Sequence, residues 1–255
     1  MNFNNKTILI TGASTGIGKE IAVKLSKINC NLILIARRIE LLNDLVEELS
    51  PNSKAEFLTL KCDVSKKDEV KEAYKKSIDK FRRIDITILN AGFGENMKVD
   101  EYNSELAELT FGANVFGIIF WVEQLLPNFL KRKEGIIVGI SSLADNRGFS
   151  GSGFYCASKA AASIYLEGLR VELTEYNIKV ITVKPGFVKT PMTDKNDFEM
   201  PLLMQADKAA KIILNGIEQE KRIIQFPFPI VFVTKLVGLL PGWFYEFLAK
   251  RKLFQ

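Results

Sequence analysis

The chain contains 255 residues, of which 47% are hydrophobic and 25% are charged, and its formal net charge at pH 7 is +5. This length and this balance are typical of one globular domain with a single large core, and they argue against a disordered chain. The basic residues are dispersed among acidic ones. Nucleic acid is therefore not expected as a partner, because nucleic-acid binders gather positive charge on one face.

The composition also removes whole classes of chemistry. The sequence has no histidine, so no imidazole is available as a base for a catalytic serine or cysteine, or as a zinc ligand. Cys30, Cys62 and Cys156 are far apart and odd in number, which predicts neither a metal site nor a disulfide framework and favours a reducing compartment. The apolar run near the N-terminus is too short for a signal peptide, and we expect a cytoplasmic protein.

Short apolar runs alternate with helix-periodic segments along the chain. In chain order, the expected elements are a strand at 7–10, a helix at 17–28, a strand at 32–36, a helix at 40–49, a strand at 57–60, a helix at 70–81, and strands at 86–89, 136–140 and 180–183. Apolar strands that are each followed by a helix predict a parallel sheet with helices on both faces. The expected fold is therefore α/β, a Rossmann-like, doubly wound parallel sheet in a single domain.

The first expected strand runs into a glycine-rich turn, residues 11–18, which reads Thr-Gly-Ala-Ser-Thr-Gly-Ile-Gly. Glycines let the backbone adopt positive φ and approach a pyrophosphate closely, and the following helix offers free N–H groups to that anion. A tight turn would explain the glycines alone, but their position after an N-terminal strand favours dinucleotide binding. The residues expected to bind are Gly12, Ser14, Thr15, Gly16, Ile17 and Gly18.

The end of the second expected strand indicates which dinucleotide is bound. A site that prefers NAD places a carboxylate there for the ribose 2′-hydroxyl, whereas an arginine pairs with the 2′-phosphate of NADP. Here the strand ends in Ala36, Arg37 and Arg38, and the planar guanidinium of Arg37 matches a phosphate well. Two solvated arginines at a helix start are the alternative. We expect NADP(H) as the cofactor, with NAD(H) less favoured.

A tyrosine and a lysine, Tyr155 and Lys159, have the i, i+4 spacing that places two side chains on one face of a helix. A phenol alone is a poor acid–base catalyst at neutral pH, but a nearby ammonium stabilises the phenolate and lowers the pKa of the phenol. Such a pair would exchange a proton with a carbonyl oxygen. Ordinary surface pairs have the same spacing, so the motif needs support from elsewhere in the chain.

Two further polar residues give that support. Ser142 follows the strand expected at 136–140, so it would face the ligand crevice and hydrogen-bond a substrate oxygen; its neighbour Ser141 is the alternative. Asn114 lies in the middle of an apolar helical segment, where a buried amide needs hydrogen-bond partners. It would hold a water that relays protons to Lys159, or it would only cap or kink the helix.

Taken in order, these motifs resemble those of the short-chain dehydrogenase/reductase family over roughly residues 5–220. The resemblance rests on the glycine-rich turn, Asp63-Val64, Asn90-Ala91-Gly92, Asn114, Ser142, Tyr155, Lys159 and Pro185-Gly186. Members of that family often have asparagine where this chain has Leu89 and Gly139, positions that support the site without performing its chemistry.

The resemblance implies hydride transfer between a nicotinamide and a carbonyl or secondary-alcohol carbon. Tyr155 would be the general acid and base, Ser142 would orient the substrate, Lys159 would lower the pKa of Tyr155 and hold the nicotinamide ribose, and Asn114 would support the relay water. The other expected cofactor contacts are Asp63 and Val64 at the adenine, Asn90, Ala91 and Gly92 along the groove, and Val188 and Thr190 at the carboxamide end. Pro185 and Gly186 are expected to bind the cofactor as well. No metal is expected, and the family suggests a homodimer or homotetramer through the helices that contain Asn114 and Tyr155.

The substrate side is expected to be apolar. A segment at about 187–207 would act as a lid, with a passive surface loop as the alternative. Around it, Phe93, Leu143, Phe149 and Phe154 suggest a pocket without an anion clamp. This favours a lipophilic ketone or alcohol as substrate. The competing hypothesis is a non-catalytic dinucleotide sensor or scaffold on the same fold, against which the four intact catalytic residues argue.

Residues 1–222 would form the catalytic domain, and residues 223–255 a hydrophobic, helical C-terminal extension of it. Prolines and charged residues interrupt this extension, so it is not expected to span a membrane. Two short amphipathic helices with Trp243, Phe244 and Tyr245, and a basic end at 250–252, would suit peripheral contact with a membrane surface. A subunit interface or a cover for the substrate pocket is the favoured alternative.

Overall fold

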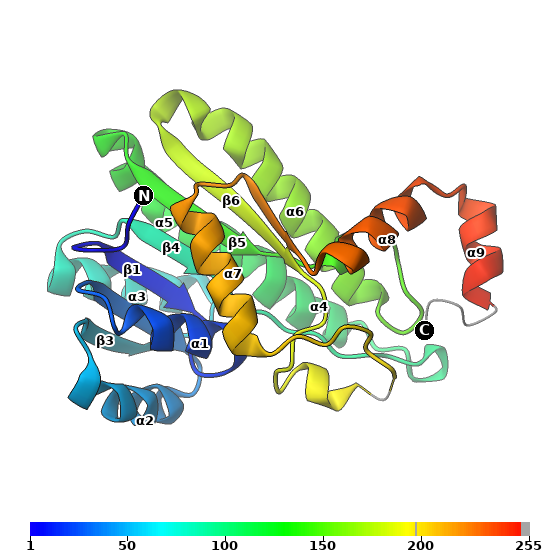
Figure 1. The fold of residues 1–255 in the computed structure, drawn as a ribbon, viewed down its shortest axis with the longest axis horizontal. Helices are drawn as coiled ribbons and strands as arrows, with labels where there is room; N and C mark the ends of the chain where they lie inside the picture. Colours follow the sequence, from blue (N-terminus) through cyan, green and yellow to red (C-terminus); the bar gives the residue numbers. More distant parts are fainter. Residues whose placement is uncertain (197, 251–255) are drawn as a thin grey trace.

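The computed structural model describes residues 1–196 and 198–250, and within them seven strands form one parallel sheet (Figure 1). In chain order the strands are β1 (Thr7–Thr11), β2 (Asn31–Ala36), β3 (Glu56–Lys61), β4 (Ile86–Leu89), β5 (Gly135–Ile140), β6 (Ile178–Pro185) and β7 (Ile223–Phe226). Their order in the sheet is β3-β2-β1-β4-β5-β6-β7. The direction of winding reverses between β1 and β4, and open parallel sheets bind ligands outside the carboxyl ends of their strands at such a point.

The central strands are apolar at successive positions because both faces of the sheet are covered. Every residue of β1, β4 and β5 is buried. Along β1, Ile8 and Ile10 pack into the core on one face, whereas Leu9 between them packs into the core on the opposite face. The expectation of a parallel sheet with two covered faces is therefore confirmed.

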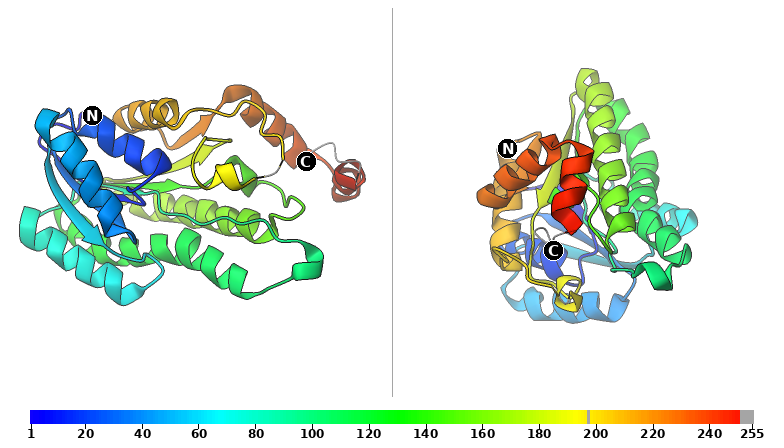
Figure 2. Two further views of the ribbon diagram at one scale, coloured as in Figure 1. Left: turned by 90° about the horizontal axis from the view of Figure 1, so that it is seen from below. Right: turned by 90° about the vertical axis from the view of Figure 1, so that its right-hand side faces the viewer.

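Helices flank the sheet in two layers, which Figure 2 shows from two further directions. The core on one face includes residues of α1 (Gly16–Leu25), α2 (Ile39–Leu49) and α7 (Ala206–Glu218). The core on the other face includes residues of α3 (Lys67–Phe81), α5 (Gly117–Arg132) and α6 (Gly153–Leu173). The fold is the doubly wound, Rossmann-like one that the sequence predicts.

One long helical segment of the structure, residues 105–132, is strongly apolar. Glu105–Arg132 combines α4 (Glu105–Phe111), a π-helical turn η3 (Gly112–Phe116) and α5, and by length and composition it is apolar enough to cross a membrane. In the structure it packs beside the sheet, where Trp121, Leu125 and Phe129 are almost completely buried. Burial of these side chains in the core accounts for part of its apolar character.

The C-terminal extension begins with a strand before it becomes helical. β7 pairs in parallel with β6, from Thr182 opposite Ile223 to Pro185 opposite Phe226. Two helices follow, α8 (Phe228–Leu239) and α9 (Gly242–Lys250). The two short helices of the extension are thus present, but its first four residues belong to the sheet. The end of the basic segment expected at 250–252 lies outside the described residues.

Candidate active site

The glycine-rich turn connects β1 to α1 and depends on close backbone contacts. Gly12 and Gly16 adopt positive φ angles of 66° and 57°. A Cβ atom on Gly12 would lie 2.9 Å from Cα of Ala91, and one on Gly18 would lie 2.4 Å from the carbonyl oxygen of Gly12. Side chains are therefore excluded where the backbone must turn tightly, and the N-terminus of α1 borders a cleft in which its free N–H groups favour an anion.

The end of β4 holds this turn in place. The Nδ2 atom of Asn90 donates to the carbonyl oxygens of Thr11 and Gly12, at 3.1 and 3.2 Å. The hydroxyl oxygen of Thr11 accepts the backbone N–H groups of Asn90 and Ala91, both at 3.0 Å. These hydrogen bonds join the ends of β1 and β4 at the point where the sheet order reverses. Asn90 therefore has a structural role in addition to any contact with a ligand.

A single cleft at this edge of the sheet brings together nearly all of the expected site residues. Those that line it are Gly12, Ser14, Thr15, Gly16, Ile17, Arg37, Asp63, Val64, Asn90, Ala91, Gly92, Ser142, Tyr155, Lys159, Pro185, Gly186, Val188 and Thr190. Gly18 packs behind the turn against Gly12, and Asn114 is fully buried behind the lining. The sequence interpretation missed Ala36 and Cys62 in the lining, although they stand at the ends of β2 and β3 and were identifiable from that position. Phe93, expected in the substrate pocket, and Met192, in the expected lid, also line the cleft.

The charges of the cleft suit a phosphate-bearing dinucleotide. Arg37 and Arg38 follow β2 directly, are exposed, and border the cleft. Among the described residues that line the cleft, Asp63 is the single acid. Its carboxylate accepts hydrogen bonds from the backbone N–H and the hydroxyl of Ser65, at 3.0 and 2.8 Å. The tight glycine turn, the open N-terminus of α1 and these arginines therefore fit the phosphates of a nicotinamide dinucleotide.

Tyr155 and Ser142 meet in the cleft from different elements. Tyr155 stands in the first turn of α6, and Ser142 precedes the 3-10 turn η4 (Leu143–Asp145) that follows β5. Burial raises the pKa of Tyr155, and a hydrogen bond with Ser142 acts in the opposite direction. Ser141, the alternative to Ser142, instead donates its hydroxyl proton to the carbonyl oxygen of Lys159 at 2.9 Å.

Lys159 lies one helical turn after Tyr155 and is only 4% exposed. Its Nζ donates to the carbonyl oxygen of Ile140 at 3.0 Å and lies 5.6 Å from the centroid of the Tyr155 ring. Burial lowers the pKa of Lys159 to about 8, while the negative charge of Asp145 opposes that change. The expected lowering of the Tyr155 pKa by Lys159 stays a prediction, since burial is the largest influence on that phenol.

Asn114 stands in the π-helical turn η3 and not in a regular α-helix. Its side chain is completely buried, and its Oδ1 accepts the backbone N–H of Phe93 at 2.8 Å. Its Nδ2 donates to the carbonyl oxygen of Phe93 at 2.8 Å and to the hydroxyl of Ser158 at 2.9 Å. Asn114 therefore joins the loop after β4 to α6, immediately beside Lys159.

A nearly buried ion pair connects two loops of the site. Lys184, the residue before Pro185 on β6, contacts Asp145 at the end of η4 with an Nζ to Oδ2 distance of 2.6 Å. Their side chains are 20% and 7% exposed. The hydroxyl of Ser163 on α6 contacts both Asp145 and the hydroxyl of Ser141. The sequence interpretation missed this network because its members are far apart along the chain.

The segment expected as a lid folds back on itself beside the cleft. The N–H of Lys189 donates to the carbonyl oxygen of Met204 at 2.8 Å, and Met204 in turn donates to Phe187 at 3.0 Å. Position 197 of this segment lies outside the described residues. Opposite the segment, a Cβ atom on Gly94 would lie 2.8 Å from the Tyr155 ring and 3.5 Å from the sulfur of Met192. Only glycine lets this loop approach the phenol so closely.

Comparison with known proteins agrees with the fold and the geometry of the site. Residues 6–200 match the family model described as short chain dehydrogenase, and the chain belongs to that family. It is therefore an oxidoreductase of the short-chain dehydrogenase family with a fold that binds a nicotinamide dinucleotide. An uncharacterized oxidoreductase of Myxococcus xanthus is 32% identical over 249 residues, covering 96% of this chain and 97% of the relative. A second, from Listeria monocytogenes, is 32% identical over 235 residues, covering 88% and 94%.

Solved structures share the architecture at lower sequence identity. A short-chain dehydrogenase from Sphingobium yanoikuyae in complex with NADPH has a TM-score of 0.80 and 24% identity, covering 93% of this chain and 97% of the other. A short-chain dehydrogenase/reductase from Burkholderia phymatum in complex with NAD has a TM-score of 0.85 and 23% identity, covering 92% and 94%. The fold is therefore common to proteins that carry either form of the cofactor.

Proposed function

We propose that this protein is an NADP(H)-dependent oxidoreductase that interconverts a carbonyl group and a secondary alcohol in a lipophilic substrate. The observation that carries the proposal is the hydrogen-bonded pair of Tyr155 and Ser142 in the cleft, with the buried ammonium of Lys159 beside the phenol ring. The cofactor supplies or accepts the hydride. The side chains of the protein bind the substrate oxygen and donate a proton to it or remove one from it.

In the direction of reduction, Tyr155 donates its phenolic proton to the substrate oxygen. Burial raises the pKa of Tyr155 and keeps the phenol protonated at neutral pH, which is the form that a general acid needs. Ser142 donates a hydrogen bond to the same oxygen and stabilises the negative charge that develops on it. Lys159 stabilises the phenolate that remains, and Asn114 supports the water through which the proton is replaced.

Tyr155→Phe tests this assignment. The variant keeps the ring and its packing but removes the proton, so turnover falls by about 10³-fold, the size of a typical general-acid contribution. Cofactor binding, measured by fluorescence titration, stays unchanged. Tyr165→Phe on the same helix is the matched control and leaves turnover intact. Full activity of Tyr155→Phe would contradict the mechanism.

The preference for NADP(H) is proposed from Arg37, which follows β2 at the place where a 2′-phosphate would be held. Arg37→Ala removes a charge-assisted hydrogen bond, so NADPH binds about tenfold to hundredfold more weakly. NADH, which has no 2′-phosphate, binds the variant and the parent equally and serves as the internal control. Tighter binding of NADH than of NADPH, unchanged by Arg37→Ala, would overturn the assignment.

A dinucleotide sensor or scaffold is the second candidate function, since the same fold serves proteins without catalysis. The proposed enzyme oxidises NADPH in the presence of at least one member of a panel of aldehydes, ketones and quinones. A sensor binds NADPH and turns over none of them.

The segment at about 187–207 is proposed as the lid over the substrate. Met192 of this segment lines the cleft, which supports the proposal.

We also propose a homodimer or homotetramer formed through α4, η3 and α6. Leu109, Phe116, Ile164 and Val171 are between 48% and 72% exposed on these elements, which leaves an apolar surface for a second copy. A cytoplasmic location is proposed because all three cysteines are free and buried, which suits a reducing compartment.

A further inference from the structure

A second group of exposed apolar side chains lies on α8 and α9, away from the surface of α4, η3 and α6. Its members are Phe228, Phe232, Val233, Leu236, Leu239 and Trp243, which together are named here the C-terminal patch. Phe228, Leu239 and Trp243 are 78%, 82% and 74% exposed. Folded proteins rarely leave so many large apolar groups together in water, so this patch calls for a partner.

The sequence of α8 explains why the patch is so apolar. The helix was expected to be amphipathic, but it is apolar on both sides: Val231 and Val237 are buried, while Phe232 and Leu236 face outwards. Lys235 is the single charged residue of α8, and it is exposed among the apolar side chains. Inward packing therefore accounts for only part of the apolar character of this helix.

The charge around the patch indicates the chemistry of its partner. Between positions 228 and 255 the sequence contains one acidic residue, Glu246, and four basic ones, Lys235, Lys250, Arg251 and Lys252. Exposed Trp and Phe side chains next to lysines match an anionic lipid surface, where aromatic rings enter the headgroup region and ammonium groups meet lipid phosphates. A symmetric contact with a second copy would instead place Lys235 and its counterpart in the same interface, where their like charges would repel each other.

α8 is held at both ends, and its start packs against the rim of the active site. At the start of the helix, a Cβ atom on Gly186 would lie 3.1 Å from Pro227 and 3.5 Å from Ile230, so this turn of α8 packs against the cleft-lining Gly186. At its end, Nε and Nη2 of Arg147 donate to the carbonyl oxygens of Val237 and Gly238, at 3.2 and 3.1 Å. These contacts hold the patch beside the cleft.

A second set of contacts fastens the middle of α8, and α9 through Tyr245, to the same loop. Asn146 donates from Nδ2 to the carbonyl oxygen of Thr234 at 2.7 Å, and the hydroxyl of Tyr245 donates to the carbonyl oxygen of Gly148 at 2.6 Å. The guanidinium of Arg147 lies 5.2 Å from the centroid of the Tyr245 ring. Residues 146–148 directly follow η4, which directly follows Ser142. The loop that contacts α8 and α9 is therefore continuous with the segment that carries Ser142.

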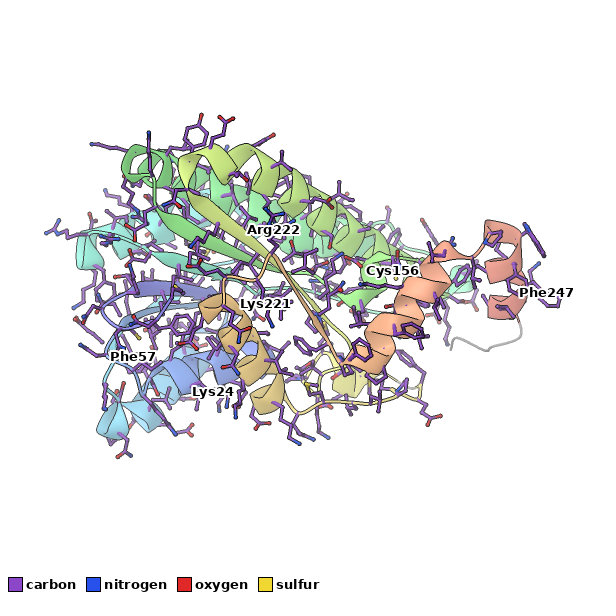
Figure 3. The ribbon with its side chains drawn as sticks, turned by 45° about the horizontal axis from the view of Figure 1, so that its top comes forward. Lys24, Phe57, Cys156, Lys221, Arg222 and Phe247 are labelled. Carbon is purple, nitrogen blue, oxygen red and sulfur yellow. The ribbon has the colours of Figure 1, made fainter. Side chains whose placement is uncertain are left out.

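The helices project from the end of the molecule where the cleft lies. β7 runs parallel to β6, and α8 begins directly beyond its carboxyl end. Figure 1 shows α8 and α9 extending from that end, and Figure 2 (right) shows them in front of the sheet. In Figure 3, Phe57 on β3 and Phe247 on α9 mark opposite ends of the molecule.

We propose that the C-terminal patch docks this protein onto the surface of an anionic lipid bilayer and holds the active-site cleft beside the lipid. α8 has 12 residues and is about 18 Å long, shorter than the roughly 30 Å of a bilayer core, so it lies on the surface without spanning it. A lipophilic carbonyl or alcohol dissolved in the bilayer then reaches the cleft directly. This last step rests on the proposed function, whereas docking does not.

Vesicle flotation of the full chain with bound cofactor tests the docking. We expect the protein to float with vesicles of phosphatidylcholine and phosphatidylglycerol, to bind pure phosphatidylcholine more weakly, and to dissociate as salt is raised. The double variant Phe232→Ser with Trp243→Ser lowers the vesicle partition coefficient at least tenfold. Lys235→Glu lowers it at least fivefold on anionic vesicles, because each basic group near such a surface strengthens binding about fivefold.

The double variant Val99→Ser with Tyr176→Ser is the matched control, because it removes exposed apolar groups outside both the C-terminal patch and the proposed subunit interface, and it leaves vesicle binding unchanged. Binding of NADPH, which requires no turnover, is retained in the patch variants and shows that they fold. The proposal is overturned if the parent protein floats with neither vesicle, or if the patch variants float as the parent does. A fall in solution mass in the Phe232 and Trp243 variant, without any vesicle binding by the parent, would assign the patch to a subunit contact. Flotation without turnover of any substrate would count against the proposed function alone.

Discussion

Among single residues of the site, Asp145 has the widest influence although it does not line the cleft. Its carboxylate pairs with Lys184, contacts Ser163, and opposes the lowering of the Lys159 pKa that burial causes. It stands three positions after Ser142, while Lys184 immediately precedes Pro185 of the cleft lining. One carboxylate therefore joins the loop that carries Ser142 to the end of β6, which is expected to contact the nicotinamide.

Asp145→Asn separates the electrostatic role of this carboxylate from its packing. Loss of the negative charge lowers the pKa of Lys159 further below about 8, so Lys159 loses its proton at lower pH and the alkaline limb of the pH–rate profile moves to lower pH. Lys184→Gln also breaks the ion pair but keeps the carboxylate, so that limb does not move to lower pH. Each variant loses about 1 to 2 kcal/mol of stability in urea unfolding, because a largely buried charge loses its partner.

The same residues show how far sequence reasoning reaches at this scale. Tyr155, Lys159 and Ser142 were predictable, since two share a helical turn and the third follows an apolar strand. Asp145 and Lys184 each look like an ordinary surface charge, and only the pairing of β5 with β6 brings them within 2.6 Å. Gly94 was missed for a similar reason, because its need for glycine comes from the Tyr155 ring, a neighbour distant in sequence.

At the scale of elements, the π-helical turn η3 shapes the floor of the site. It places Asn114 where all of its polar side-chain atoms bond to Phe93 and Ser158. Asn114→Ala leaves part-buried backbone groups of Phe93 without their side-chain partners, which costs about 1 to 2 kcal/mol of unfolding free energy. We expect turnover to fall as well, because α6 loses its tie beside Lys159. Asn128→Ala on the exposed side of α5 is the control and changes stability by no more than about 0.5 kcal/mol.

Element boundaries were predicted less completely than element types. The i, i+3, i+4 spacing of apolar residues is nearly the same in an α-helix and through a single π-helical turn, so nothing in residues 112–116 distinguishes η3. β7 was merged with the helices of the extension, because four residues at the edge of a sheet are too few to show a strand period. The long strands and helices of the first half were predicted well, since each is apolar over its whole buried length.

For the molecule as a whole, the position of the site follows from its topology. The apolar strands and intervening helices predict the doubly wound sheet, and that sheet gathers the residues after β1, β2, β4 and β5 at one edge. The exterior of the molecule was harder to predict. Both apolar surfaces, on α4 to α6 and on the C-terminal patch, arise from side chains that the sequence alone could assign equally well to a core.

Buried thiols give the whole molecule a dependence of stability on alkaline pH. Burial raises the pKa of Cys30 from 9.0 to about 11 and that of Cys62 to about 12. The unfolded chain releases these protons near pH 9 while the folded protein keeps them, so stability falls as the pH rises above about 9. Lys159 acts in the opposite direction, because its pKa drops from 10.5 to about 8 on folding. Between these two pH values the unfolded chain holds a proton that the folded protein has released, so this group makes stability rise with pH.

Two thiols outweigh this one lysine, and burial of Cys156 and Tyr155, which raises the pKa of both, adds to their effect. The free energy of unfolding should therefore decline by about 1 to 3 kcal/mol per pH unit around pH 10, as measured by urea unfolding under reducing conditions. Replacing Cys30 and Cys62 together by alanine removes two of the protons involved and flattens the decline. A stability that stays level between about pH 8 and pH 10 in the parent protein would mean that these thiols are more hydrated than their burial in the two cores implies.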